Sequence, residues 1–110
     1  MKIYIKATGN AGQEVNYIKV EFYYSKGGMN YMTYKNEKRG YYISVTPVKR
    51  EDRGSYCMES YVGFSGFKDC LLEVTRQSKK AEETAREIFY QEKSRYINYL
   101  IERHGLTLEA

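Results

Sequence analysis

The chain of 110 residues has no tryptophan, one proline, one histidine and two cysteines. No stretch approaches the roughly 20 apolar residues of a membrane span, and the N-terminus lacks the apolar core of a signal peptide. These absences predict a soluble, cytoplasmic protein without a membrane partner. Cys57 and Cys70 show no CxxC spacing and with His104 offer at most three ligands, so we expect reduced thiols, no metal site and no cofactor.

Residues that could carry out catalysis are also scarce. His104 lies at a predicted helix end, where capping explains it, and neither cysteine has a histidine predictably near it. Glu51 and Asp52 form a carboxylate pair, but the same run holds basic residues that neutralise it. The paired glycines at 27–28 lack the lysine that follows in a phosphate-binding loop. We therefore predict a protein that is not an enzyme and has no catalytic residues.

Tyrosine is the residue that the chain has in excess. Of its thirteen tyrosines, ten fall between Tyr4 and Tyr61, in segments that alternate like β-strands. A tyrosine ring is a large apolar surface with a hydroxyl that must be hydrated or paired, so it suits half-buried faces and interfaces. A sheet with an aromatic outer face is the resulting expectation. The net charge of +4 is compatible with nucleic acid and equally with an ordinary mixed-charge surface.

The length of the chain predicts a single domain over residues 1–110. Alternating apolar and polar residues predict a sheet at about 2–75. Paired glycines at 27–28 favour a hairpin turn between the second and third strands. Pro47 cannot donate to a ladder, so its strand is expected to end there or to lie at an edge. Segment 67–74 fits a helical pattern as well as a last strand, which we favour. The predicted strands are residues 1–7, 15–24, 30–35, 41–48, 56–62 and 67–74.

One long helix is predicted at about 79–104, with Ser78 as its N-cap and Gly105 just after its end. The fold class is therefore α+β: an antiparallel β-meander of four to six strands packed on one long C-terminal helix. A helix of about 39 Å is longer than these strands. Its end either exposes Ile97, Leu100 and Ile101, which would suit a homodimer through the helix, or is covered by a curved sheet or by the tail.

The sheet face away from the helix is the predicted binding site. Aromatic rings surrounded by cations can stack nucleic-acid bases and neutralise phosphates, but tyrosines can also stack on each other across strands in a purely structural role. The residues proposed for this face are Tyr17, Tyr23, Tyr31, Tyr42 and Tyr61, with Lys19 and Lys35 nearby.

Two charged turns provide further candidate binding residues. The first holds Lys35, Lys38 and Arg39. The second holds Lys49, Arg50 and Arg53. Consecutive turns of a meander lie at opposite ends of the sheet, which argues against one continuous basic patch.

Several segments together resemble a group of small proteins carried by phages, plasmids and conjugative elements of Gram-positive bacteria. They are GGMNY at 27–31, RGYYISVTPV at 39–48, FSG at 64–66, LEV at 72–74 and SKKAE at 78–82. The likeness covers about residues 20–106 and brings no catalytic residues. It implies a compact protein that inhibits or modulates host nucleic-acid-handling machinery, as anti-CRISPR and anti-restriction proteins do. Many such inhibitors are acidic mimics of DNA, whereas this chain is basic, which argues against mimicry.

The sequence thus predicts a non-enzymatic binding protein of anti-CRISPR type. Its expected partner is a protein in a nucleic-acid-handling complex or nucleic acid itself. Two alternatives stay open: a protein that binds single-stranded nucleic acid directly, and a small structural or regulatory homodimer.

Overall fold

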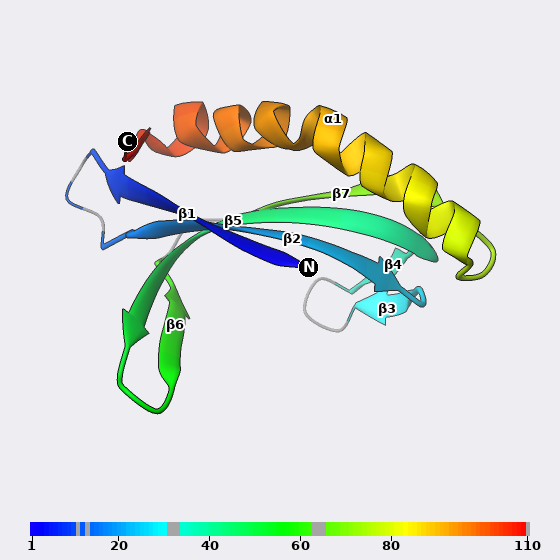
Figure 1. The fold of residues 1–110 in the computed structure, drawn as a ribbon, viewed down its shortest axis with the longest axis horizontal. Coiled ribbons are helices and arrows are strands. Elements are labelled where there is room, and N and C mark those ends of the chain that lie inside the picture. Colours follow the sequence, from blue (N-terminus) through cyan, green and yellow to red (C-terminus); the bar gives the residue numbers. More distant parts are fainter. Residues whose placement is uncertain (11, 13, 31–33, 63–65, 110) are drawn as a thin grey trace.

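An antiparallel sheet with one long helix across one face forms the body of the computed structural model (Figure 1). The structure describes residues 1–10, 12, 14–30, 34–62 and 66–109. The predicted α+β class is confirmed. The elements are β1 Lys2–Gly9, β2 Tyr17–Ser25, β3 Gly28–Asn30, β4 Lys35–Glu37, β5 Gly40–Asp52, β6 Cys57–Tyr61, β7 Phe67–Glu73, α1 Lys79–His104 and β8 Leu106–Leu108.

The strand order is β6-β5-β2-β1-β8, and β7 also pairs with β5. The preferred assignment of 67–74 to a strand is therefore correct. The third sheet strand, however, was wrongly predicted at 30–35, of which residues 31–33 lie outside the described part of the chain. In the structure β3 pairs only with β4, as a small separate sheet, and β5 is the strand that pairs with β2. The predicted hairpin at Gly27 and Gly28 is therefore wrong, because β2 and β3 do not pair. Both glycines have positive φ angles, but that local feature does not specify which strand pairs next.

The central strand β5 is 13 residues long and has different partners along its two edges. It pairs with β2 on one edge, while the other edge is divided between β7 and β6. Pro47 is buried inside this strand, so the prediction that it ends the strand or lies at an edge is wrong. The pairing with β7 ends at Val45 and the pairing with β6 begins at Val48. Pro47 thus lies at a break between two partners, where no ladder requires its missing N–H.

Helix α1 has the predicted bounds and caps. Ser78 accepts a hydrogen bond from the Ala81 N–H, and Gly105 adopts the left-handed conformation that closes the helix. The buried face of the helix packs on the side of the sheet that carries the apolar side chains of β2 and β5. The helix residues buried there are Ala85, Phe89, Tyr96, Ile97 and Leu100. Among the described residues, no helix is long and apolar enough to cross a membrane.

The C-terminal end of the helix does not overhang the sheet. Ile97 and Leu100 are buried and Ile101 is partly buried, so the predicted exposure of an apolar dimer surface is wrong. After Gly105 the chain turns back, buries Leu106 and forms β8, which pairs with β1. The sequence analysis left coverage by the tail open as an alternative, and this tail strand provides it.

Candidate binding surface

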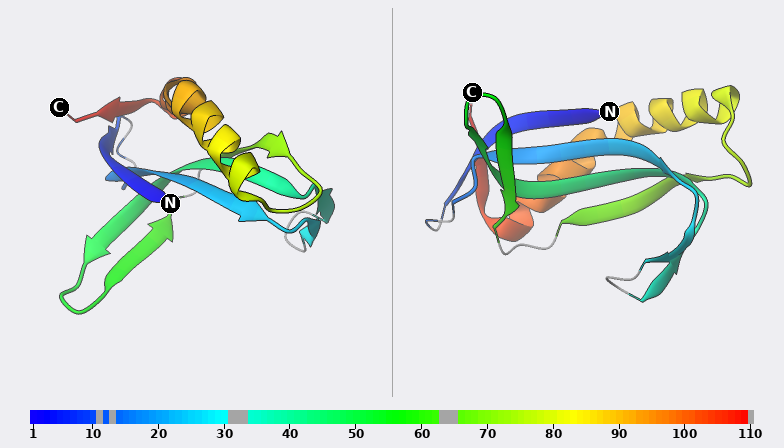
Figure 2. Two further views of the ribbon diagram at one scale, coloured as in Figure 1. Left: turned by 45° about the vertical axis from the view of Figure 1, so that its right-hand side comes forward. Right: turned by 90° about the horizontal axis from the view of Figure 1, so that it is seen from below.

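Two hairpins project from the sheet on the side opposite to the helix, at opposite ends of the molecule (Figures 1 and 2). One consists of β3 and β4, and the other of β6 with the second half of β5. Between them lies the helix-free face of the sheet. The predicted binding residues are on this face and on the two hairpins, except Tyr31, which lies outside the described residues.

Lys19 was predicted as a cation near the binding tyrosines, but it is a buried part of the structure with only 6% of its surface exposed. Its Nζ lies 2.5 Å from Glu59 Oε1 of β6 and 3.2 Å from Glu21. The hydroxyl of Tyr4 donates to the other oxygen of Glu59 at 2.6 Å. Glu59 therefore joins the β5–β6 hairpin to both β1 and β2. We call these four residues the Lys19–Glu59 cluster.

The ionisation of the Lys19–Glu59 cluster follows from these contacts. Burial opposes both charges, but the hydrogen bonds overcome it. The pKa of Lys19 is raised by its contacts with Glu59 and Glu21, despite desolvation. The pKa of Glu59 is lowered, because the hydrogen bonds from Lys19 and Tyr4 outweigh its desolvation. Lys19 is thus a paired structural cation, and little of its charge is available to a phosphate.

Tyr17 and Tyr61 flank this cluster and differ in exposure. Tyr17 is half-buried, with its ring edge-on to Tyr4 at a centroid distance of 6.0 Å. Tyr61 of β6 is 68% exposed, and Lys19 Nζ lies 5.4 Å from the centre of its ring. Of this pair, Tyr61 is the one able to offer a ring to a partner.

Tyr23, near the end of β2, and Tyr42, near the start of β5, form a stacked pair on the helix-free face. Their ring centroids are 5.8 Å apart and their planes are inclined by 19°. Lys68 of β7 lies over both rings, at 5.4 and 5.2 Å from the centroids, and forms an ion pair with Glu37 at 2.8 Å. Tyr42 is buried and donates its hydroxyl hydrogen to the carbonyl oxygen of Lys38 at 2.6 Å. For these two residues the arrangement is the structural one, in which tyrosines stack on each other across strands.

The buried hydroxyl of Tyr42 provides a test of this arrangement. Burial raises its pKa to about 12. In the unfolded chain a tyrosine ionises near about 10, so we expect stability to fall as the pH rises from about 10 to about 12, where only the unfolded state loses this proton. Tyr42→Phe should lack this component of the alkaline destabilisation. Urea unfolding at several alkaline pH values measures it, and an identical pH dependence of the two proteins would contradict the assignment.

Exposed tyrosine and methionine side chains gather on the two hairpins. Tyr34 is 80% exposed and has a φ of 55°, a left-handed conformation that is unusual for a bulky residue and typical of functional or strained positions. Sequence analysis missed all of these side chains except Tyr61. Their position beside turn residues such as Gly28 and Gly54 was the available signal. The exposed set is Met29 and Tyr34 at the β3–β4 hairpin, and Tyr56, Met58 and Tyr61 at the β5–β6 hairpin.

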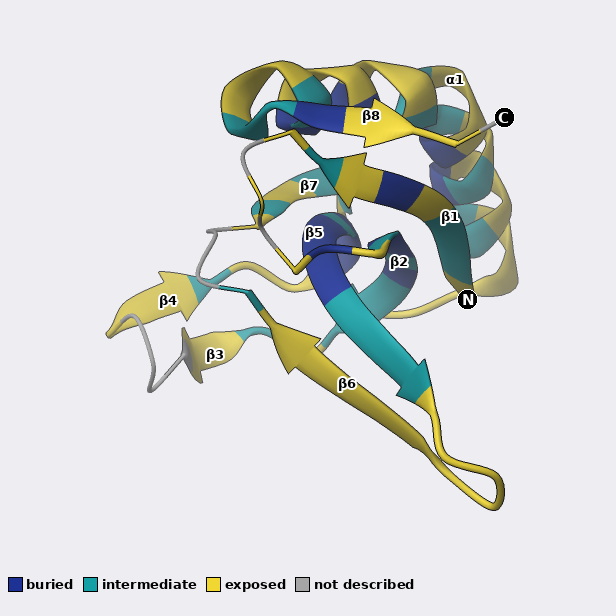
Figure 3. Ribbon diagram, turned by 90° about the vertical axis from the view of Figure 1, so that its left-hand side faces the viewer, coloured by how far each residue is buried: buried dark blue, intermediate teal, exposed yellow. Residues whose placement is uncertain are grey.

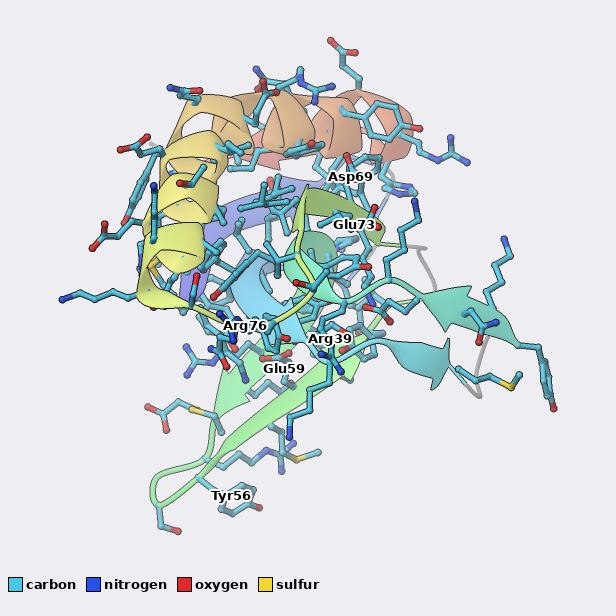
Figure 4. The ribbon with its side chains drawn as sticks, turned by 90° about the vertical axis from the view of Figure 1, so that its right-hand side faces the viewer. Arg39, Tyr56, Glu59, Asp69, Glu73 and Arg76 are labelled. Atoms are coloured by element: carbon cyan, nitrogen blue, oxygen red, sulfur yellow. The ribbon has the colours of Figure 1, made fainter. Side chains whose placement is uncertain are left out.

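The predicted loop at 49–54 is wrong in its first part, because Lys49 and Arg50 lie within β5, which runs to Asp52. The two groups of basic residues still lie toward opposite ends of that strand. Lys38 and Arg39 directly precede the strand, and Arg53 follows it. Figure 4 labels Arg39 by the segment that leads into β5, and Tyr56 at the tip of the β5–β6 hairpin. Lys35 is exposed on β4.

Most of the basic side chains in these turns have partners within the chain. Lys49 contacts Glu14 and Glu51, each at 3.2 Å, and Arg53 contacts Glu51 at 2.7 Å. The guanidinium of Arg50 lies 4.2 Å from the centre of the Tyr4 ring. At the other turn Lys38 pairs with Glu73 at 3.2 Å, and Arg39 donates to the carbonyl oxygen of Thr75 at 2.6 Å. In the described part of the chain, these basic turns therefore carry mixed charge.

A hollow of about 370 Å³ lies between β4 and β7. Three lysines and two carboxylates line it, so it has no marked preference for either sign of charge. Its lining residues are Lys35, Asn36, Glu37, Lys38, Tyr42, Lys68, Asp69 and Cys70. Among the residues that the structure describes, no group of three or more acidic, cysteine or histidine side chains could hold a metal ion.

The two hairpins therefore form the best candidate surface, because they expose the largest group of aromatic and sulfur-containing side chains on the side away from the helix. Comparison with protein-family models, with curated proteins and with solved structures finds no match for this chain.

Proposed function

We propose that this chain is a non-enzymatic binding protein that grips a protein partner with its β3–β4 and β5–β6 hairpins. The observation that carries the proposal is the exposure of Met29, Tyr34, Tyr56, Met58 and Tyr61 on these hairpins. Tyrosine and methionine are enriched in protein interfaces, and tyrosine is among the residues whose truncation most often weakens binding.

The distribution of charge favours a protein partner over nucleic acid. Binding to nucleic acid draws most of its free energy from cations that are free to meet phosphates. Here Lys19, Lys49 and Lys68 are paired with carboxylates of the chain. The rings of Tyr23 and Tyr42 stack on each other and so are not free to stack on bases.

The resemblance to small proteins of phages, plasmids and conjugative elements supplies the biological setting of the proposal. In that setting the partner is a component of the host machinery that handles nucleic acid, and the sharpest form of the function is an inhibitor of anti-CRISPR type. A protein of this kind acts by occluding a working surface of its target. It needs no cofactor and no active site to do so.

Photo-crosslinking tests the proposal. A benzoylphenylalanine placed at Tyr34 or at Tyr56 should form adducts with a protein of the host extract. The same residue placed at Tyr90 is the matched control, since Tyr90 is 57% exposed but lies on α1. Once the partner is identified, Tyr56→Ala and Tyr61→Ala should each weaken binding about tenfold or more, as interface tyrosines do.

The other outcomes separate the alternatives. Adducts that disappear after nuclease treatment, together with micromolar binding of labelled single-stranded DNA or RNA that weakens steeply with salt, would favour direct nucleic-acid binding. Adducts formed as readily from position 90 as from the hairpins would contradict the proposal.

A further inference from the structure

Strand β6 has an open edge. It is the last strand in the order β6-β5-β2-β1-β8, and its five residues, Cys57 to Tyr61, are all exposed. In Figure 3 the β5–β6 hairpin stands away from the body of the molecule, and among the described residues β6 pairs with β5 alone. An edge strand in this position presents a row of unpaired backbone groups.

The direction of these groups follows from the pairing with β5. The N–H of Arg53 donates to the carbonyl oxygen of Tyr56 at 2.8 Å, so the backbone groups of Tyr56 point toward β5. Residues two apart in a strand point the same way, and their neighbours point the opposite way. The N–H and C=O groups of Cys57, Glu59 and Tyr61 are therefore directed outward from the hairpin.

This edge lacks several of the features that usually block pairing with another chain, and its one charged side chain, Glu59, is paired with Lys19. Residues 57–61 include no proline and no lysine, and the register between β5 and β6 continues without a bulge from Val48 to Asp52. Edge strand β7 differs, because it includes Lys68 and its pairing with β5 is irregular between Tyr41 and Tyr42. Strand β6 is also held in place, because the Glu59 carboxylate accepts hydrogen bonds from Lys19 and Tyr4.

We propose that an extended segment of the protein partner adds to β6 as a further strand. This inference rests on the proposed function and specifies how the β5–β6 hairpin holds its target. The backbone of the segment would bond to the outward groups of Cys57, Glu59 and Tyr61, and main-chain bonds of this kind give affinity in strand addition. Exposed Tyr61 and Met58 flank the edge on opposite faces, because their positions differ in parity. They favour a segment with apolar side chains on both faces.

A second copy of the chain is a poorer occupant of this edge. In a symmetric antiparallel pair centred on the middle residue of β6, Glu59 would face the Glu59 of the other copy. Like charges directly opposite each other destabilise a strand pair. A segment from a different protein carries no such constraint.

Peptide selection combined with hydrogen exchange tests the proposal. Phage-displayed random peptides of 12 residues would be selected on the intact protein and synthesised. Bound peptides should slow the exchange of the Cys57, Glu59 and Tyr61 amides at least about tenfold, because each amide gains a hydrogen bond. Amides of the β3–β4 hairpin serve as the internal reference and should not change.

Two substitutions at one position supply the matched variants. Cys57→Pro removes an outward N–H that the pairing with β5 does not use, and we expect peptide affinity to fall about tenfold or more. Cys57→Ser keeps the N–H and should bind like the parent chain. Retained protection of the Met58 amide would show that Cys57→Pro leaves the hairpin folded.

The possible failures are distinguishable. Selected peptides that protect other amides, a selection that yields no peptide protecting this edge, or equal binding by Cys57→Pro and Cys57→Ser would overturn strand addition. Protection that appears without peptide and rises with protein concentration would assign the edge to a second copy and also overturn it. Failure of these tests, with crosslinks from positions 34 and 56 intact, would leave the proposed function standing. Edge protection without any protein crosslink would count against the proposed function alone.

Discussion

Glu59→Gln is expected to destabilise the protein by about 2 kcal/mol at neutral pH and to loosen the β5–β6 hairpin. The substitution removes the charge that Lys19 Nζ contacts at 2.5 Å and leaves that buried cation with Glu21 alone. Breaking a fully buried pair costs about 3–5 kcal/mol. The expected cost is lower here because the Glu59 side chain is 24% exposed. Urea unfolding measures the loss, and faster exchange of the Met58 amide would report the loosened hairpin.

The pH dependence of this effect distinguishes the ion pair from general packing. The pKa of Glu59 is lowered below its ordinary value of 4.5, so its contribution to stability is present above that value and is lost as the pH falls through the folded-state pKa. The difference between the parent chain and Glu59→Gln should therefore shrink in acid. Glu83→Gln, at an exposed position on α1, is the control and should change stability little at any pH. A difference that stayed constant down to acid pH would contradict the assigned role.

Phe89→Ala is expected to have the largest effect on stability, about 3–4 kcal/mol. Phe89 is fully buried at the centre of α1, where its ring lies 5.4 Å from that of Phe22 on β2. Removing the ring loses apolar burial and leaves a cavity between the helix and the sheet. For a chain of this size the melting temperature should fall by roughly 10–15 °C.

Two further substitutions on the same helix calibrate the Phe89 prediction. Phe89→Leu retains most of the buried volume and should cost much less. Glu87→Ala lies at an exposed position and should stay within about 0.5 kcal/mol of the parent chain. A small effect of Phe89→Ala would mean that the helix does not depend on this contact with the sheet.

The helix was the part of the fold that the sequence predicted best. Its signals are local: Ser78 caps the first turn, Gly105 ends the last one, and apolar residues recur at helical spacing between them. Strand positions were also mostly predicted by alternation. Strand partners were not, because pairing depends on residues far apart in the chain. The prediction for Pro47 was wrong for this reason. Pro47 lies where one edge of β5 changes its partner from β7 to β6, and the residues around Pro47 do not indicate that change.

The sequence predicted some of the residues on the candidate surface. The sequence predicted Tyr61 and the basic turns as part of this surface. It could not show that Lys19 forms an ion pair with Glu59, 40 residues later in the chain. Nor could the sequence distinguish the stacked rings of Tyr23 and Tyr42 from the exposed tyrosine rings. Alternation predicts on which face of the sheet a side chain lies, but not whether another side chain covers it. The exposed Tyr34 and Tyr56 lie near turns, where period-two patterns end.

One edge of β5 is divided between β7 and β6, and this division affects which residues of the chain can change during evolution. The core side chains of the strand, Tyr41, Ile43 and Val45, come from the half that pairs with β7. Beyond Val48, residues 49–52 and 57–61 contribute nothing to that core. Substitutions in the β5–β6 hairpin should therefore change the free energy of unfolding little, provided that Glu59 is kept. If the proposed function holds, such a chain could change the partner it binds through a few residues of this hairpin, while the sheet and helix that form the core stay constant.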